Sequence, residues 1–499
     1  MQYFFQIVFG ASLTFAFAPF DHWWLAFLVL PISIFIIKIS KHSGFKHGFC
    51  FALGYFGVGI SWVHVSIADF GGLPLIGSIA LMLLLCGYLA LYPAVVFMLL
   101  KRYVKIQHWP IVLPLLWLIM EWLRARFLTG FPWLSIGYSQ LEGPLNGLFP
   151  VVGEIGVSTI LVCLSASLAL GLVRKRIHYS IILCTVVLAT SYSIQNIDWV
   201  TVDKTKNAKV TMVQGNIPQS LRWTPEQDIP TMQKYLTMTE EHWDSDLIIW
   251  PEAAIPKLEP IASEFIDLLD RRATSEHAAL ITGIVNYQFE TERVYNNLIA
   301  LGLDTKTQNT IPYRYMHSNR FAKHHLLPIG EFVPFESFLR GLAPIFDLPM
   351  SSFTRGDYQQ HNLKVKGFNL TPAICFEIVF PAQIAANLYD DTDAIITVSN
   401  DAWFGDSHGP HQHLQIAQVR AREFGLPVFR ATNNGVTAFV DHKGEISKIA
   451  PQFKDATLTN SVTFVEGKTP YRIYGDYPTW LFFVFLNLLL LLNNLRQSD

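Results

Sequence analysis

Cys375 is the only one of five cysteines that lies outside the most apolar segments of the chain. An apolar stretch at 371–374 precedes it and predicts a buried strand, and Glu377 follows two residues later. A thiol at the end of a strand lies at the rim of a sheet, where a substrate can reach it. Upstream, Glu252 follows a Trp-Pro pair and Lys323 precedes two histidines. A thiol, a carboxylate base and an ammonium are the groups that acyl transfer through a thioester requires.

Glu252 follows the short apolar run 247–250, which predicts a strand ending in Trp-Pro-Glu. The carboxyl edge of a sheet is where α/β proteins usually build their sites. Burial there raises the pKa of a carboxylate and suits it to act as a base. The alternative is a glutamate that begins the next helix, and the residues alone leave both open.

Lys323 belongs to a residue type that is ordinarily exposed. The residues after it are apolar and include Gly330 and two prolines, unlike a solvated face. An ammonium near a thiol lowers the pKa of the thiol and stabilises a developing oxyanion. We expect Glu331 and Glu377, which lie close in sequence to Lys323 and Cys375, to support these groups rather than to be merely exposed.

Three histidines follow the Ser399-Asn-Asp segment and raise the alternative of a zinc site. They are His408, His411 and His413. Neither a cysteine nor an HExxH pattern accompanies them, and histidines also cap helices and line sites. We therefore expect no metal and no cofactor.

The composition predicts a membrane protein with a soluble part. The chain has 499 residues, of which 51% are hydrophobic and 15% charged, and its mean hydropathy is +0.30. Soluble domains carry about 25% charged residues. The net charge of −2 and the lack of a basic block argue against a nucleic-acid partner. The remaining cysteines lie in apolar runs and predict no disulfide framework: Cys50, Cys86, Cys163 and Cys184.

Apolar runs approach the ~20 residues that cross a bilayer and predict eight transmembrane spans. They are roughly 2–19, 24–39, 46–67, 73–100, 109–127, 150–173, 177–195 and 478–494. The run at 24–39 is short and could be partly re-entrant. The first run lacks a basic start and others follow it closely, which argues against a cleaved signal peptide.

Lysines and arginines concentrate in alternate loops, which predicts orientation. Basic residues gather in the loops 38–46, 101–105 and 174–176, while the loops between them carry almost none. We therefore expect both termini in the cytoplasm and the soluble domain outside it. In such an oxidising compartment an unpaired thiol at Cys375 favours a catalytic duty over a buried structural thiol.

The segment 196–477 is long enough for one large globular core and alternates strands with helices. Predicted strands lie at 210–213, 247–250, 279–282, 394–398 and 436–440, and predicted helices at 226–242, 259–274 and 411–424. Strands alternating with helices indicate sheets covered by helices, an α/β fold. The expected domains are a transmembrane domain at 1–195, this soluble domain, and a C-terminal span with a short tail at 478–499.

The order and spacing of several motifs resemble the carbon–nitrogen hydrolase (nitrilase) superfamily, and most closely its membrane-bound apolipoprotein N-acyltransferase family. The resemblance covers essentially the whole chain. In the soluble part the motifs are Gln214-Gly-Asn-Ile-Pro-Gln-Ser220 with Arg222-Trp223, Trp250-Pro-Glu-Ala-Ala254, Lys323-His-His-Leu326, Gly330-Glu-Phe-Val-Pro334, Ile374-Cys-Phe-Glu377, Ser399-Asn-Asp-Ala-Trp-Phe-Gly405 and Gln415-Ile-Ala-Gln-Val-Arg-Ala-Arg-Glu423. In the membrane part the similar motif is Phe131-Pro-Trp-Leu-Ser-Ile-Gly-Tyr138.

The resemblance implies an αββα sandwich on an eight-helix membrane domain, with Glu252, Lys323 and Cys375 as the catalytic triad. It implies acyl transfer from a phospholipid, with phosphatidylethanolamine as the expected donor, to the N-terminal amine of a diacylglyceryl-cysteine lipoprotein in a bacterial inner membrane. Phe376 departs from the family, where a tyrosine often follows the cysteine, so a hydroxyl is absent there. With Trp223 and Trp403 it is a candidate substrate-binding residue, and the apolar segment 338–350 is a candidate lid.

Two other functions fit part of the sequence. A membrane-tethered amidase would use the same triad with water as the acceptor. A transporter with a soluble receptor domain would need ionisable residues in its spans, and Glu121 and Glu154 are the main ones. The matches in the membrane part and the expected position near lipid favour the acyltransferase.

Overall fold

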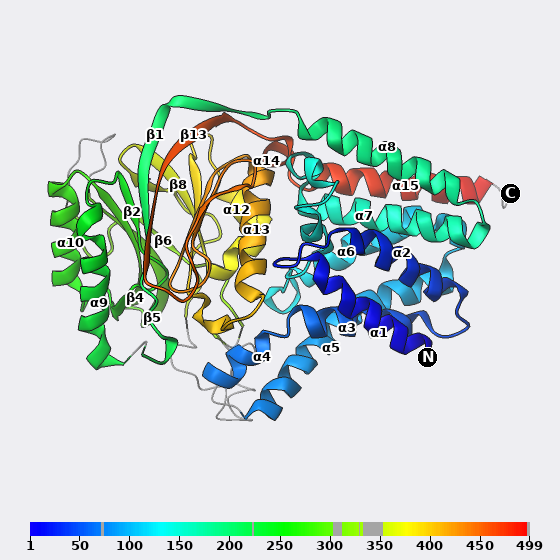
Figure 1. Ribbon diagram of the computed structural model, residues 1–499, viewed down its shortest axis with the longest axis horizontal. Helices are drawn as coiled ribbons and strands as arrows, with labels where there is room; N and C mark the ends of the chain where they lie inside the picture. Colours follow the sequence, from blue (N-terminus) through cyan, green and yellow to red (C-terminus); the bar gives the residue numbers. More distant parts are fainter. Residues whose placement is uncertain (71–73, 222–223, 303–311, 329, 333–352, 497–499) are drawn as a thin grey trace. The chain divides into compact units, whose positions relative to one another are not determined.

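A computed structural model describes residues 1–70, 74–221, 224–302, 312–328, 330–332 and 353–496. The chain divides into two compact units (Figure 1). Met1–Ala68, Leu73–Trp199 and Lys468–Asp499 form the first unit, and Val200–Gly467 forms most of the second. The predicted lid at 338–350 and Trp223 lie outside the described residues.

The first unit consists of apolar helices. They are α1 (Gln2–Leu13), α2 (Trp24–Ile39), α3 (Gly44–Gly59), α4 (Val63–Val65), α5 (Leu75–Tyr103), α6 (Trp109–Arg124), α7 (Phe149–Arg174), α8 (Ile177–Gln195), α14 (Pro470–Tyr474) and α15 (Tyr477–Arg496). Five described helices are long and apolar enough to cross a membrane, or up to six if the pair bent by 62° after α3 counts as one. The prediction of a membrane part built of apolar helices is confirmed, and the number of eight spans stays a prediction.

Helix α1 is shorter than the run at 2–19 because it ends at Leu13 and gives way to a short 3₁₀ turn. Pro19 disfavours helical backbone at the residue before it, so the apolar run continues without continuing the helix. Helix α2 is an apolar helix of 16 residues, below the usual spanning length.

The second unit contains two sheets. In the first, the described strands run in the order β13 (Ala456–Gly467), β1 (Val200–Gln214), β2 (Leu247–Ile249), β4 (Ala279–Gln288), β5 (Arg293–Gly302), β6 (Arg320–Ala322), with β3 (Ile255–Leu258) paired to β4. In the second, the order is β12 (Ile446–Ile449), β11 (Ala438–Val440), β10 (Val428–Thr432), β9 (Ala394–Ser399), β8 (Phe368–Ile374), β7 (Leu363–Val365). The strands at the centre of each sheet are parallel, so their carboxyl ends share one edge.

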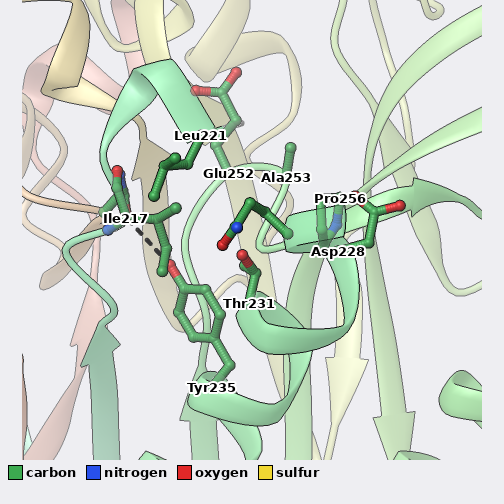
Figure 2. A pocket seen from close by; sticks show the side chains of 10 residues that line it. Ile217, Leu221, Asp228, Thr231, Tyr235, Glu252, Ala253 and Pro256 are labelled. Atoms are coloured by element: carbon green, nitrogen blue, oxygen red, sulfur yellow. Dashed lines mark hydrogen bonds between the residues drawn. The ribbon is translucent and has the colours of Figure 1, made fainter. Parts of the chain in front are cut away.

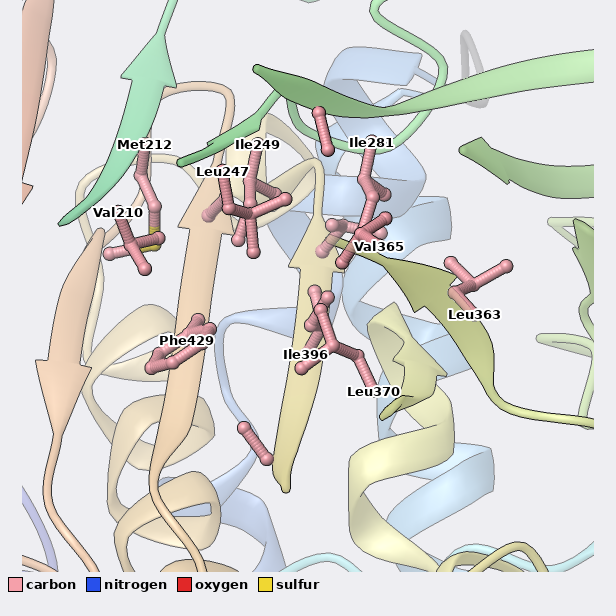
Figure 3. Close-up of a cluster of buried hydrophobic side chains, with 14 of the residues drawn as sticks. Val210, Met212, Leu247, Ile249, Ile281, Leu363, Val365, Leu370, Ile396 and Phe429 are labelled. Carbon is pink, nitrogen blue, oxygen red and sulfur yellow. The ribbon is translucent and has the colours of Figure 1, made fainter. Parts of the chain in front are cut away.

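The two sheets pack face to face around a buried apolar core. Val210, Met212 and Ile249 of the first sheet point toward Ile396 and Phe429 of the second (Figure 3). Each of these side chains is fully buried, and they alternate along their strands with residues that face away from the other sheet. This alternation is what fixes both sheets as the inner layers of a sandwich.

Helices cover the outer faces of the sandwich (Figure 1). Helices α9 (Pro225–Thr239) and α10 (Ser263–Ser275) pack on the first sheet through a second apolar cluster that includes Tyr235, Trp250 and Leu269. Helices α12 (Pro381–Ala386) and α13 (Gly409–Phe424) lie on the second sheet. The predicted α/β fold, the αββα layers and the helices near 226–242, 259–274 and 411–424 are confirmed.

Candidate active site

Glu252 lies just past the carboxyl end of β2, where the chain turns sharply against β4. Ala253 has a φ of +46°, in the left-handed region. A Cβ on Gly283 would lie 2.2 Å from the Ala253 nitrogen and 2.8 Å from the Glu252 Cα, so only glycine allows this approach. The turn therefore fixes the position of the Glu252 backbone, and with it the point from which the carboxylate projects at the edge of the sheet.

Lys323 follows β6 and its side chain is 2% exposed. Its Nζ lies 3.3 Å from Oε1 of Glu252 and donates to Oε1 of Glu331 at 2.9 Å. Burial alone would lower the pKa of Lys323, but the carboxylates of Glu252 and Glu331 outweigh burial and raise it. The ammonium is therefore charged at any physiological pH.

Asn296 of β5 links the two carboxylates that hold the lysine. Its Nδ2 donates to Oε1 of Glu252 at 2.8 Å and to Oε1 of Glu331 at 3.0 Å. The backbone N–H of Asn400, after β9, donates to the other Glu252 oxygen at 3.1 Å. The cluster is thus a fixed array in which each carboxylate has several donors.

Glu377 is buried and organises the backbone on both sides of the site. One oxygen accepts from the N–H groups of His324 and His325 at 2.8 and 3.1 Å and from Gln383 at 2.7 Å. The other accepts from the N–H of Ile374 at 2.8 Å. Burial raises the pKa of Glu377, and these hydrogen bonds oppose that shift. Glu377 therefore ties the segment after Lys323 to the segment before Cys375.

Cys375 is the first residue after β8 and has a φ of +52°. A non-glycine residue rarely adopts this conformation, so the backbone at Cys375 is strained. The side chain is partly exposed, and Ser399 Oγ lies 3.3 Å from its sulfur. The sequence-based prediction of a thiol directly after a buried strand is confirmed.

The charges around Cys375 act against one another. The pKa of its thiol is raised to about 12, first by burial and then by the Glu252 carboxylate, while the Lys323 ammonium lowers it. The thiol is therefore protonated at neutral pH in the free protein, and a base must remove its proton before it can attack. Glu252, Lys323 and Cys375 are thus brought within electrostatic reach of each other, with Glu331 at the lysine.

Asp401 lies behind the thiol in a buried polar group. Burial opposes its ionisation, but Arg430 and His413 lower the pKa of Asp401 well below its usual range. Arg430 donates to Oδ2 of Asp401 at 2.6 Å, and His413 Nε2 donates to the Cys375 carbonyl at 3.1 Å. Among the described residues, no group of three or more His, Cys, Asp and Glu side chains has the arrangement of a metal site.

The candidate substrate-binding residues differ in their surroundings. Phe376 is 4% exposed and packs edge-to-face on Phe380 with ring centroids 5.2 Å apart. Trp403 lies in the 3₁₀ turn Asp401–Phe404 and is partly exposed. Beside Glu252, a pocket is lined by apolar and polar side chains that include Ile217, Leu221, Thr231, Tyr235, Ala253 and Pro256 (Figure 2). A reactant in this pocket would lie against the Glu252 carboxylate.

Sequence analysis missed Asn296, Asp401 and Arg430 as parts of this array. Asn296 and Asn297 form a buried polar pair inside the mostly apolar strand β5. Because a buried polar side chain requires a hydrogen-bond partner, this pair could have been recognised from the sequence as a candidate part of the site. Arg430 likewise interrupts the buried strand β10. A charged residue in the middle of a buried strand calls for a partner, which here is Asp401.

Comparisons with known proteins agree with the division into two parts. Residues 9–167 match the model of the apolipoprotein N-acyltransferase N-terminal domain, and residues 209–468 match the carbon–nitrogen hydrolase model. An apolipoprotein N-acyltransferase of Vibrio cholerae is 46% identical over 480 residues, which is 95% of this chain and 93% of the relative. One of Photobacterium profundum is 44% identical over 95% of this chain and 91% of the relative.

Among solved structures, Saccharomyces cerevisiae Nit3, a member of branch 10 of the nitrilase superfamily, is similar over 53% of this chain and 93% of its own. The identity is 17% and the TM-score 0.39.

Proposed function

Because the chain belongs to the apolipoprotein N-acyltransferase family of the carbon–nitrogen hydrolase superfamily, we propose that it moves a fatty acyl chain from a phospholipid to the N-terminal amine of diacylglyceryl-cysteine apolipoproteins. One observation carries the proposal for the site. A protonated thiol, Cys375, lies within reach of both a carboxylate, Glu252, and a buried ammonium, Lys323. These are the nucleophile, the base and the cation of thioester chemistry.

The first half-reaction forms the thioester. Glu252 takes the proton of Cys375, and the thiolate attacks the sn-1 ester carbonyl of a phospholipid, for which phosphatidylethanolamine is our candidate. Lys323 and a backbone N–H after Cys375 hold the oxyanion. When the tetrahedral intermediate collapses, the carbon–oxygen bond of the ester breaks and the carbon–sulfur bond remains. Glu252 gives its proton to the departing lysophospholipid oxygen.

The second half-reaction discharges the thioester. The α-amine of the lipoprotein attacks the thioester carbonyl while Glu252 accepts a proton from the amine. The carbon–nitrogen bond forms and the carbon–sulfur bond breaks. The sulfur leaves with the electron pair and regains its proton from Glu252. No metal or other cofactor takes part in either half.

The proposal places the enzyme in a bacterial inner membrane, with the catalytic domain on the periplasmic side and both termini in the cytoplasm. About eight spans at 1–195 and 478–499 would then flank an extracytoplasmic domain at 196–477. The basic loops at 38–46, 101–105 and 174–176 support this orientation. A phosphatase reporter fused near residue 300 should be active, and reporters near residue 104 or at the C-terminus inactive. An inactive reporter near residue 300 would overturn the orientation.

The decisive test is the mass of the purified protein after incubation with phosphatidylethanolamine alone. Without an amine acceptor the reaction should stop at the thioester, adding one fatty acyl mass to a peptide that contains Cys375. Neutral hydroxylamine should release the acyl group, and Cys375→Ala should never acquire it. If the wild-type protein acylates lipoproteins but carries no adduct even in rapid-quench experiments, direct transfer replaces the thioester route.

The same experiment separates the acyltransferase from a membrane-tethered amidase. A lipoprotein with a free diacylglyceryl-cysteine amine should discharge the adduct and become an amide that resists hydroxylamine. If only water discharges it, the amidase is the correct function. Water is always present, so a persistent adduct also requires a site that disfavours hydrolysis.

A further inference from the structure

We propose that Ser399 is a further catalytic residue, whose hydroxyl turns its single proton from Asp401 to the Cys375 sulfur each time that sulfur carries negative charge. The proposal deepens the thioester chemistry proposed above and rests on it. It assigns a second donor to the nucleophile, separate from Lys323.

The geometry places the Ser399 hydroxyl between two acceptors. Its Oγ lies 3.3 Å from Sγ of Cys375 and 2.6 Å from Oδ1 of Asp401. Both arrangements suit donation by the hydroxyl, but a serine has one hydroxyl proton and can donate to one acceptor at a time. Ser399 is fully buried, so water does not compete for that proton.

The fold fixes this contact through adjacent parallel strands. Cys375 follows β8 and Ser399 ends β9, and the two strands pair in register with Ile374 opposite Val398. The next residue of each strand therefore lies at the same sheet edge. Ser399 points away from the apolar core between the sheets, because Val398 points into it.

Asp401 is anchored so that it can release the hydroxyl without losing its charge. Its Oδ2 accepts from Arg430 at 2.6 Å, and its Oδ1 has His413 Nδ1 at 3.2 Å in addition to Ser399. All four side chains are buried. The carboxylate therefore keeps its hydrogen bond from Arg430 when the serine proton turns to sulfur.

His413 contacts the nucleophile from the backbone side. Its Nε2 lies 3.1 Å from the Cys375 carbonyl oxygen, which can only accept, so this nitrogen carries a hydrogen. The hydrogen bond holds Cys375 in its left-handed conformation, with φ of +52°. Asp401 and His413 are positioning residues that act through Ser399 and through the Cys375 backbone.

The two helical layers of the sandwich differ in a way that fits this role. Helices α9 and α10 meet the first sheet through a mainly apolar cluster. On α13, β10 and the turn after β9, buried polar and charged side chains accompany the buried apolar ones: Asp401, His413, Arg420, Glu423 and Arg430. Buried charges stabilise a fold poorly compared with apolar packing. Their concentration next to Cys375 therefore indicates a functional role.

The Ser399 proton changes its acceptor at each step of the reaction. At rest the thiol proton is on sulfur and the Ser399 proton points to Asp401. When Glu252 takes the thiol proton, the serine proton turns to the thiolate, and it turns back when the carbon–sulfur bond forms. When the amine later displaces the sulfur, the electron pair of that bond returns to sulfur and the serine donates again. Ser399 never loses its proton.

The test measures how the alkylation of Cys375 depends on pH in the full-length protein in detergent, with iodoacetamide as probe and peptide mass spectrometry to separate Cys375 from the other cysteines. Alkylation needs the thiolate but no lipid or lipoprotein. Its outcome is therefore independent of whether the proposed acyl transfer is correct. In Ser399→Ala we expect the rate at a fixed pH below the thiol pKa to fall about tenfold, equivalent to a rise of about one pKa unit.

Matched variants distinguish the effect of losing the hydroxyl from the effect of changing the volume of the side chain. Ser245→Ala removes another buried serine hydroxyl in the same unit, 2.8 Å from Thr211, and should alkylate like the wild type. Ser399→Thr keeps the hydroxyl and Ser399→Val removes it at the same volume, so threonine should retain the wild-type profile and valine should shift like alanine. This pair also decides the matter if Ser399→Ala does not fold. Equal profiles for threonine and valine, or an equal shift in Ser245→Ala, would overturn the proposal.

Discussion

Replacing Lys323 by methionine should destabilise the catalytic unit and make its stability depend on pH. The change keeps an unbranched side chain of similar volume and removes an ammonium that lies 2.8 Å from Glu331 and 3.3 Å from Glu252. Removing one partner from a buried ion cluster costs about 3–5 kcal/mol, because the other charges stay buried without compensation. At about 2–4 °C per kcal/mol, the apparent Tm should fall by roughly 10 °C at neutral pH.

The pH dependence follows from the two carboxylates left behind. Asn296 contacts both at 2.8 and 3.0 Å, so Glu252 and Glu331 are close neighbours. Without the lysine, the two buried carboxylates repel each other, so protonation of one of them stabilises the folded variant. The folded variant then binds protons more readily than the unfolded chain, so its stability falls as the pH rises.

The wild type should lack this dependence. Glu252 and Glu331 raise the pKa of Lys323, so its contribution to stability is present below the unfolded lysine pKa of about 10.4 and is lost only at higher pH. Thermal melts of the detergent-solubilised protein between pH 4.5 and 8 would test the difference.

Two variants serve as controls for these melts. Lys234→Met removes a lysine whose partner Asp455 is half exposed, and should melt within about 2 °C of the wild type. The double variant Lys323→Met with Glu331→Gln should recover part of the lost Tm but no activity. A Lys323→Met protein that melts like the wild type at both ends of the pH range would refute the buried ion cluster.

Three further outcomes are expected. Glu252→Gln should fold and insert normally but form no thioester, as measured by acyl mass on the cysteine peptide, since the amide cannot take the thiol proton. Gly283→Ala should reduce transfer about 100-fold by displacing the glutamate turn, whereas Gly87→Ala, where a Cβ meets nothing within 4 Å, should not. Burial lowers the pKa of His325 to about 4, so kcat/KM of the wild type and of His325→Gln should depend on pH in the same way between pH 5 and 8.

Local sequence patterns predicted the elements whose signal is local. The apolar run at 394–398 is β9, and the helical period at 411–424 is α13, because each depends on burial of one face. The same reasoning placed Cys375 directly after a strand, which the structure has. Strand β13 was not predicted, since its residues are mostly half exposed and its pairing with β1 is a contact across more than 240 residues.

The contacts within the site were beyond any local pattern. Lys323 meets Glu252 across 71 residues, and Asn400 meets Glu252 across 148. Such contacts depend on the order of strands in a sheet, which periodicity does not encode. The sequence shows that Asn296 is a polar residue within a mostly apolar strand, but it does not show which residues Asn296 contacts.

The distances between the charges suggest why two glutamates pair with one lysine. If Glu252 were the only partner of Lys323, its carboxylate alone would have to neutralise the buried ammonium. Glu331 lies closer to the ammonium, at 2.8 Å against 3.3 Å, and so supplies most of the neutralising charge. In the proposed mechanism, the lysine then remains charged to stabilise the oxyanion while Glu252 accepts a proton. In the proposed mechanism, the Cys375 thiol keeps its proton until Glu252 removes it, so this partly exposed thiol should stay unreactive toward other electrophiles between turnovers.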